Sequence, residues 1–112
     1  MRVATEQDKQ AVIALWDTAG LTRPWNDPAK DFDRALQNDN SSILIIDMEG
    51  QIIGSIMVGE DGHRGWVYYL ATHPAHQRKG IGRQLMAAAE DWIETRNIPK
   101  SQLMVRNDNE AA

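Results

Sequence analysis

Cysteine is absent from this chain of 112 residues, which excludes disulfide bonds, thiolate metal sites and a cysteine nucleophile. Long hydrophobic runs are missing too, because no stretch approaches the ~20 consecutive apolar residues that a membrane-spanning helix needs. The first residues, Met1 to Glu6, lack the apolar segment and the cleavage site of a secretion signal. We therefore expect a cytoplasmic protein that has no membrane partner.

Basic residues are in the minority. The chain has 12 Lys and Arg against 16 Asp and Glu, a formal net charge of −4 at pH 7. A chain of that sign is unsuited to general nucleic-acid binding, which needs a positive surface, although a local anion site is still allowed. The content of 42% hydrophobic and 25% charged residues is typical of a globular protein, and the length suits one core. We expect residues 1–112 to form a single domain.

The spacing of apolar residues predicts the order β-α-α-β-β-β-α-β, an α+β fold with mixed αβα layers. The expected elements, in chain order, are Arg2–Ala4, Glu6–Ala19, Pro28–Gln37, Ser42–Met48, Gln51–Gly59, Gly65–Thr72, Gly82–Thr95 and Gln102–Arg106. Three local signals fix the first two helices: Thr5 and Asp8 form a capping box, Gly20 is a stop signal, and Asp27 is an N-cap before a proline.

The helices are amphipathic, and their apolar faces predict the core. The side chains that we expect to be buried on helices are Trp16, Phe32, Leu36, Leu85, Met86, Ala89, Trp92 and Ile93. The final strand has no element to cover it, because the tail Asn107–Ala112 reads as a helix that is cut off. We expect that the chain is truncated at its C-terminus, or that a partner such as a second copy covers the bare face.

The loop between the expected strand Gly65–Thr72 and the expected helix Gly82–Thr95 carries the strongest chemical signal. Gly80 and Gly82 let a ligand approach the backbone, and the helix that follows presents unpaired N–H groups and the positive end of its dipole. Arg78, Lys79 and Arg83 are basic, and no acid occurs from His73 to Ala89. This arrangement predicts a site for a phosphate-bearing small molecule. The alternative is a turn shaped by two glycines. The loop matches neither the Walker A pattern nor the dinucleotide-binding pattern.

Four consecutive features resemble motif A of the GNAT (GCN5-related) N-acetyltransferases: a strand ending at Thr72, the His73-Pro74 corner, the loop Gln77-x-x-Gly80-x-Gly82, and an amphipathic helix. The resemblance covers essentially the whole chain. The stretches 23–28 and 61–65, with 68–70, also resemble the bacterial YpeA-type subfamily. In the family the fold continues with a further helix, which bears a tyrosine acid, and two more strands, so we expect that tyrosine to have no counterpart among residues 1–112.

The resemblance implies acetyl-CoA as the cofactor. Its pyrophosphate would lie on the backbone of Arg78, Lys79, Gly80, Ile81, Gly82 and Arg83. Its pantetheine arm would pair with Leu70, Ala71 and Thr72 as a strand does, and Asn109 would touch the cofactor. The N–H of Leu70 would stabilise the oxyanion while an amine of a small molecule or peptide attacks the thioester directly. A base, in many cases through water, would take the proton of that amine.

For several other residues, a functional role and a purely structural role are both open. Tyr68 is our candidate for the cofactor cleft, because neighbouring residues of a strand face opposite sides and Tyr69 would then face the core; the alternative is that both tyrosines only pack. Trp25, Asp61 and His63 are candidates for substrate contact, although Asp61 and His63 equally suit an exposed loop. His73 and His76 lack further ligands nearby, so no metal site is expected.

Met104 stands where relatives that acetylate protein N-termini on the ribosome carry a glutamate base, which weakens that choice of substrate. Three functions remain open at this point. One is an acetyl-CoA-dependent N-acetyltransferase, and another is a catalytically incomplete GNAT-like module that binds CoA and works with a partner. The third, a phosphate or nucleotide binder unrelated to the family, would bind ATP as well as CoA.

Overall fold

The computed structural model describes residues 1–22, 24 and 27–105. The candidate site residues Trp25 and Asn109 lie outside the described residues. The elements, in chain order, are β1 (Arg2–Val3), the 3-10 turn Glu6–Asp8, α1 (Lys9–Thr18), α2 (Pro28–Gln37), β2 (Ser41–Met48), β3 (Gln51–Glu60), β4 (Gly65–Thr72), the 3-10 turn Pro74–His76, α3 (Ile81–Thr95), the 3-10 turn Lys100–Gln102 and β5 (Leu103–Val105).

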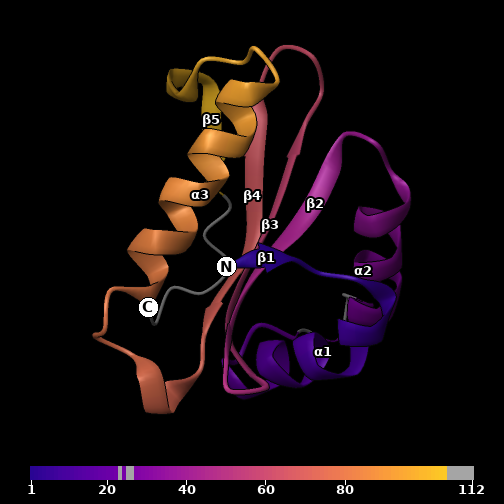
Figure 1. Ribbon diagram of the computed structural model, residues 1–112. Coiled ribbons are helices and arrows are strands. Elements are labelled where there is room, and N and C mark those ends of the chain that lie inside the picture. Colours follow the sequence, from indigo (N-terminus) through magenta and orange to yellow (C-terminus); the bar gives the residue numbers. More distant parts are fainter. Residues whose placement is uncertain (23, 25–26, 106–112) are drawn as a thin grey trace.

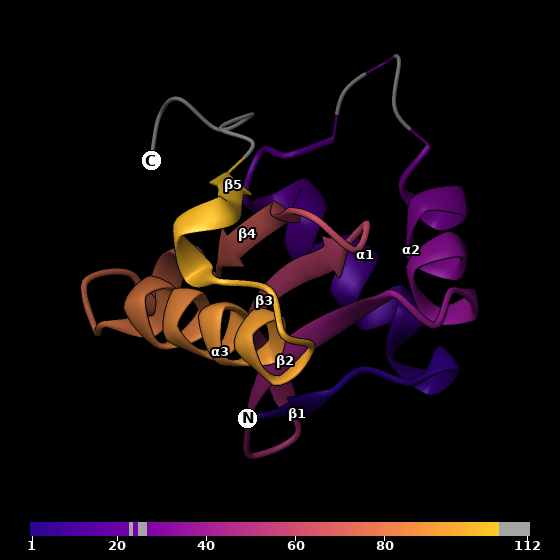
Figure 2. The same cartoon turned by 90° about the horizontal axis from the view of Figure 1, so that it is seen from above.

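The strands form one sheet in the order β1-β2-β3-β4-β5. Neighbours are antiparallel except β4 and β5, which run parallel. Figure 1 shows α3 on one face of the sheet and α1 and α2 on the other, and the view from above in Figure 2 agrees. The predicted three-layer α+β fold and its order of elements are confirmed.

Local signals set the helix boundaries as predicted. Thr5 and Asp8 form the reciprocal capping box, although a 3-10 turn precedes α1. Gly20 ends this helix in the left-handed region at φ 76°. The Asp27 side chain accepts a hydrogen bond of 3.1 Å from the Lys30 N–H at the start of α2. Each bond satisfies a terminal N–H group that the helix itself leaves unpaired.

A hydrophobic cluster fills each side of the sheet. Trp16 and Phe32 are fully buried on the α1/α2 side, and Leu85 and Ile93 are fully buried on the α3 side. Three predicted core side chains, Leu36, Met86 and Trp92, are only partly buried. The apolar face predicted for α3 is wider than the face that is buried against the sheet. The buried side chains of α3 form one row at a spacing of four, namely Ile81, Leu85, Ala89 and Ile93. Trp92 lies beside this row. The Arg96 guanidinium lies over the Trp92 ring, with its Cζ atom 4.0 Å from the ring centroid.

Two glycines let α3 pack closely against the sheet. A Cβ atom on Gly54 of β3 would lie 2.7 Å from Ile81 Cγ2 and 3.0 Å from Leu85 Cδ1, and one on Gly65 of β4 would overlap Ile93. Gly54 thus faces the first turns of the helix and Gly65 faces its last turns. The N-terminus of α3 is therefore held against the sheet by a contact that only glycine allows without movement.

The last described strand forms a partly bare edge. The side chains of Met104 and Val105 are 53% and 54% exposed, as expected for a final strand that the described residues do not cover. The covering partner remains a prediction. No described helix has both the length and the apolar character needed to cross a membrane.

Candidate functional site

A β-bulge interrupts β4 in the middle of the predicted site. Ser55 pairs with Ala71 and Met57 pairs with Tyr68, so Tyr69 and Leu70 together oppose one residue of β3. Tyr69 has a φ of 51°, in the left-handed region that a bulky side chain rarely adopts. Bulges occur often beside active sites because they turn the backbone out of the regular ladder. Here the bulge places the peptide group between Tyr69 and Leu70 in an unusual orientation.

The bulge corrects one prediction. Tyr68 and Tyr69 both pack against the cluster on the α1/α2 side, whereas Leu70 packs against the α3 side. The expectation that the two tyrosines face opposite sides is wrong, because the extra residue breaks the strict alternation of the strand. The role of Tyr68 in the cleft stays a prediction.

Tyr69 is held from three directions. Its ring stacks on the Trp16 indole with centroids 4.0 Å apart and planes 16° apart. Its hydroxyl donates a hydrogen bond of 2.6 Å to Asp31 Oδ2. The Ser55 hydroxyl donates to its carbonyl oxygen at 3.4 Å. These contacts keep a strained backbone in one conformation. No local sequence pattern predicts these contacts, since they join β4 to β3, α1 and α2.

The parallel pair of β4 and β5 covers only the beginning of β4. It extends from Gly65 opposite Leu103 to Val67 opposite Val105. The part of β4 beyond the described pairing includes Leu70, Ala71 and Thr72. It leads to residues 77–82, which we call the glycine loop. An extended ligand with amide groups would find strand-like partners there. The predicted pantetheine-binding residues are thus together at one edge.

The glycine loop has the backbone expected of an anion site. Arg78 and Gly80 have φ values of 67° and 77°, and Gly80 is the N-cap of α3 without a side-chain cap. A Cβ atom on Gly80 or Gly82 would meet nothing within 4 Å, so the loop is open to a ligand. The first N–H groups of the helix have no partners within it, and its dipole favours negative charge there.

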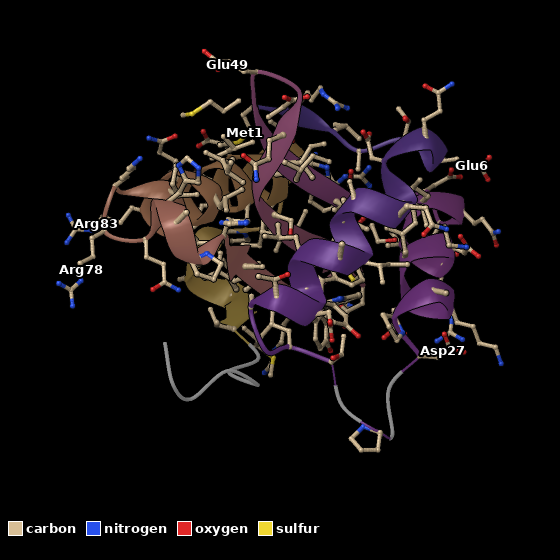
Figure 3. All side chains as sticks on the ribbon, turned by 90° about the horizontal axis from the view of Figure 1, so that it is seen from below. Met1, Glu6, Asp27, Glu49, Arg78 and Arg83 are labelled. Carbon is tan, nitrogen blue, oxygen red and sulfur yellow. The ribbon has the colours of Figure 1, made fainter. Side chains whose placement is uncertain are left out.

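Positive side chains surround this helix end. Arg78, Lys79 and Arg83 are all exposed, and Figure 3 shows Arg78 and Arg83 extending from the same end of the molecule. Lys79 Nζ lies 3.3 Å from His76 Nδ1. The described residues contain no group of three or more His, Cys, Asp or Glu side chains that could hold a metal ion. His73 Nδ1 instead accepts a hydrogen bond of 3.1 Å from the Ala75 N–H.

The candidate substrate residues Asp61 and His63 lie in the loop that precedes β4. Asp61 Oδ1 accepts hydrogen bonds from the N–H groups of Arg64 and His63, at 2.8 and 2.9 Å, and these bonds lower the pKa of Asp61. At ~3.3 Å per residue, the strand from Gly65 to Leu70 spans about 17 Å. Figure 1 shows this loop and the β4–α3 loop at opposite ends of the sheet. The structure does not bring Asp61 and His63 together with Leu70.

A five-stranded sheet with a bulge in β4 and a basic glycine loop before α3 characterises this three-layer α+β fold, and comparison with known proteins identifies the family. Residues 10–112 match the model of the Acetyltransferase (GNAT) family. An acetyltransferase of Pectobacterium atrosepticum is 44% identical over 111 residues, which are 99% of this chain and 79% of the relative. One of Sodalis glossinidius is also 44% identical over 111 residues, covering 99% of this chain and 78% of the relative.

Solved structures share the fold. A predicted acetyltransferase from Clostridium acetobutylicum, solved with acetyl-CoA, has a TM-score of 0.79 at 16% identity, covering 96% of this chain and 80% of that one. AAC(6')-Iy, solved with a bisubstrate analogue of CoA, has a TM-score of 0.77 at 18% identity, covering 97% and 79%. The chain belongs to the GNAT acetyltransferase family, and its enzyme class is that of the acetyl-CoA-dependent acetyltransferases.

Proposed function

We propose that the protein transfers the acetyl group of acetyl-CoA to an amine of a small molecule or peptide, by direct attack of the amine on the thioester. The observation that carries this proposal is the continuity of two features: the edge of β4 from Leu70 to Thr72 runs into the glycine loop at the start of α3. One ligand with an extended amide-containing arm and a pyrophosphate matches both.

The glycine loop would bind the pyrophosphate. The backbone N–H groups from Arg78 to Arg83 would donate to phosphate oxygens, and the basic side chains would add charge attraction. The open space beside Gly80 and Gly82 supports this fit, since a phosphate can come close to the backbone there. Asn109 is proposed as a further cofactor contact.

The bulge would supply the group that polarises the acetyl carbonyl. We assign the Leu70 N–H to this oxygen, where it would stabilise the negative charge that develops as the amine attacks. Acetyl-CoA supplies an activated acetyl group with a thiolate leaving group. Tyr68 lies two residues before Leu70 on the same strand, and we propose it for the cleft near the reacting groups.

The acceptor is proposed as an amine, with Trp25 as a candidate contact. Asp61 and His63 lie about 17 Å along β4 from Leu70, so we propose them only as contacts for the far end of an extended acceptor. A structural neighbour at 18% identity, an aminoglycoside acetyltransferase from an uncultured soil metagenomic sample, was solved in complex with sisomicin, which supports an amine as the acceptor. Because acetyl-CoA is a cytoplasmic metabolite, we also propose the cytoplasm as the compartment.

A turnover assay tests the proposal. The protein is incubated with acetyl-CoA and a panel of polyamines, aminoglycosides, amino acids and peptides with free N-termini, and products are read by mass spectrometry. We expect one class of amine to gain an acetyl group, with equimolar release of free CoA thiol. Binding of CoA without acetylation of any amine would instead favour the module that binds CoA but does not catalyse.

A further inference from the structure

Ser55 holds an exceptional position in the core. It is fully buried, and it is the only buried polar or charged side chain among the described residues. Its Oγ accepts a hydrogen bond of 2.9 Å from the indole Nε1 of Trp16, which is itself 0% exposed. Its hydroxyl then donates to the carbonyl oxygen of Tyr69 at 3.4 Å. The three groups form one directed chain: Trp16 donates to Ser55, and Ser55 donates to Tyr69.

The series of hydrogen bonds ends at the carbonyl of the peptide group that joins Tyr69 to Leu70. The Tyr69 carbonyl and the Leu70 N–H belong to the same planar trans peptide, in which C=O and N–H point in opposite directions. Because the carbonyl oxygen is bonded to Ser55 of β3, the Leu70 N–H must point away from Ser55, toward the side of β4 where the described pairing with β5 has ended. A hydrogen bond to a carbonyl also polarises the peptide and strengthens its N–H as a donor.

The neighbouring contacts make this orientation rigid. The Tyr69 ring stacks on the Trp16 indole, and its hydroxyl donates a hydrogen bond to Asp31 of α2. The same tryptophan therefore supports the side chain of Tyr69 through its ring and the carbonyl of Tyr69 through Ser55. No such support would be needed in a regular strand, where the ladder itself orients each peptide.

We propose that Ser55 and Trp16 are positioning residues that aim and polarise the Leu70 N–H as the donor to the acetyl oxygen. This inference rests on the proposed function, which gives that N–H its role. Neither side chain touches the ligand. Both act through the Tyr69–Leu70 peptide, so their loss should affect the acetyl group more than the rest of acetyl-CoA.

Nuclear magnetic resonance of the Leu70 amide tests the inference without an acceptor. The chain has seven leucines, so a sample labelled with ¹⁵N-leucine gives a sparse spectrum, and Leu70→Ile identifies the Leu70 signal. Acetyl-CoA and CoA are added separately. In the wild-type protein we expect acetyl-CoA to move the Leu70 amide proton further downfield than CoA does, since only acetyl-CoA brings the thioester carbonyl that we assign to this N–H.

The decisive variant is Ser55→Ala, and Ser41→Ala is its matched control. Ser41 also donates from its hydroxyl to a backbone carbonyl, that of Ala35 at 2.9 Å, but away from the bulge. We expect Ser55→Ala to reduce the downfield movement caused by acetyl-CoA and to leave the affinity for CoA unchanged. Once an acceptor is known, the kcat of the Ser55→Ala variant should be roughly threefold to tenfold lower than that of the wild-type protein, the effect of one hydrogen bond. Ser41→Ala should keep the wild-type response.

The outcomes separate the two proposals. If Leu70 is silent toward acetyl-CoA in the wild-type protein while other leucines report binding, the assigned role of Leu70 and the inference both fail. If Leu70 responds equally in wild type and Ser55→Ala, the inference alone fails. Ser55→Ala leaves the Trp16 indole N–H buried without its acceptor, which is costly. Should that variant not fold, the double variant W16F/S55A removes the unpaired donor and is expected to show the same reduced response.

Discussion

The hydroxyl of Tyr69 donates a hydrogen bond of 2.6 Å to Asp31 Oδ2 and thereby ties the bulge of β4 to α2. The two residues are 38 positions apart in the chain, and both are partly buried. A bond to a charged acceptor is stronger than one between neutral groups. It offsets part of the strain of holding a tyrosine at a φ of 51°.

A double-mutant cycle measures this bond. We expect Tyr69→Phe and Asp31→Ala each to lower the free energy of unfolding by about 1–2 kcal/mol, and the double variant to lose less than the sum, with a coupling of about 1 kcal/mol. Urea denaturation followed by tryptophan fluorescence provides the values. Strict additivity would show that the bond contributes nothing in solution.

Gly54 and Gly65 give a matched pair of substitutions for the position of α3. Gly54→Ala forces a Cβ atom against Ile81 and Leu85 at the start of the helix, and Gly65→Ala forces one against Ile93 near its end. Overpacking of this kind costs typically ~1–3 kcal/mol, so both variants should unfold at lower temperature.

The two glycine variants should differ in ligand binding. Only Gly54→Ala displaces the first turn of α3 and with it the glycine loop, so we expect weaker CoA binding for this variant and near-native binding for Gly65→Ala. Isothermal titration calorimetry, at a temperature where both variants are folded, measures the affinity of each variant for CoA. Equal losses of affinity in the two variants would refute a specific role for the Gly54 contact.

The three basic side chains of the glycine loop should contribute to CoA affinity by charge. Exposed charge pairs are worth up to about 1 kcal/mol each, so Arg78→Gln, Lys79→Gln and Arg83→Gln should each raise the Kd for CoA up to about fivefold. Arg34→Gln, an exposed arginine of α2, is the control and should not change it.

Salt provides an independent reading of the same contribution. Added KCl screens exposed charges, so CoA affinity of the wild-type protein should fall with ionic strength. The triple variant R78Q/K79Q/R83Q should show a flatter dependence, measured by titration at several KCl concentrations. An unchanged slope would mean that the backbone amides alone carry the phosphate interaction.

Asp8 should make folding stability depend on pH. Hydrogen bonds from Arg2, at 2.8 and 2.9 Å, and from the Thr5 N–H lower the pKa of Asp8 from 3.8 to about 2. Because the pKa is lower in the folded state than in the unfolded state, this carboxylate stabilises the fold above pH ~4, and the contribution is lost as the pH falls toward 2.

The test compares melting temperatures of wild type and Asp8→Asn from pH 6 to pH 2. The wild-type protein should melt higher at pH 6, and the difference should close as the pH falls. The exposed Asp39 serves as the comparison through Asp39→Asn, for which we expect a small difference at every pH. A gap between wild type and Asp8→Asn that persists at pH 2 would contradict the assignment.

The sequence predicted what depends on neighbouring residues. Capping boxes, the Asp27 N-cap and the Gly20 stop signal act within a few positions, and the glycine loop stood out because glycines and basic residues occur together before a helix. These features predicted the order of elements and the fold class, which the structure confirms, and they indicated the glycine loop as the phosphate end of the proposed site.

The remaining features depend on contacts between distant strands and helices. The bulge at Tyr69 arises from the register of β3 against β4, which no local pattern encodes, and so the two tyrosines were placed on opposite faces. Ser55 and Gly54 look ordinary in the strand Gln51–Glu60. Their importance appears only when Trp16 of α1 and Ile81 of α3 lie against them.

The most direct test of the account is calorimetric titration of the protein with acetyl-CoA, CoA and ATP in parallel. The account predicts saturable binding of acetyl-CoA and CoA at one site, with ATP much weaker, because ATP offers phosphates to the glycine loop but no arm for the edge of Leu70 to Thr72. A ligand at ~100 times its Kd would also stabilise the fold by about 2.7 kcal/mol. Equal binding of ATP and CoA, or no binding of either CoA species, would contradict it.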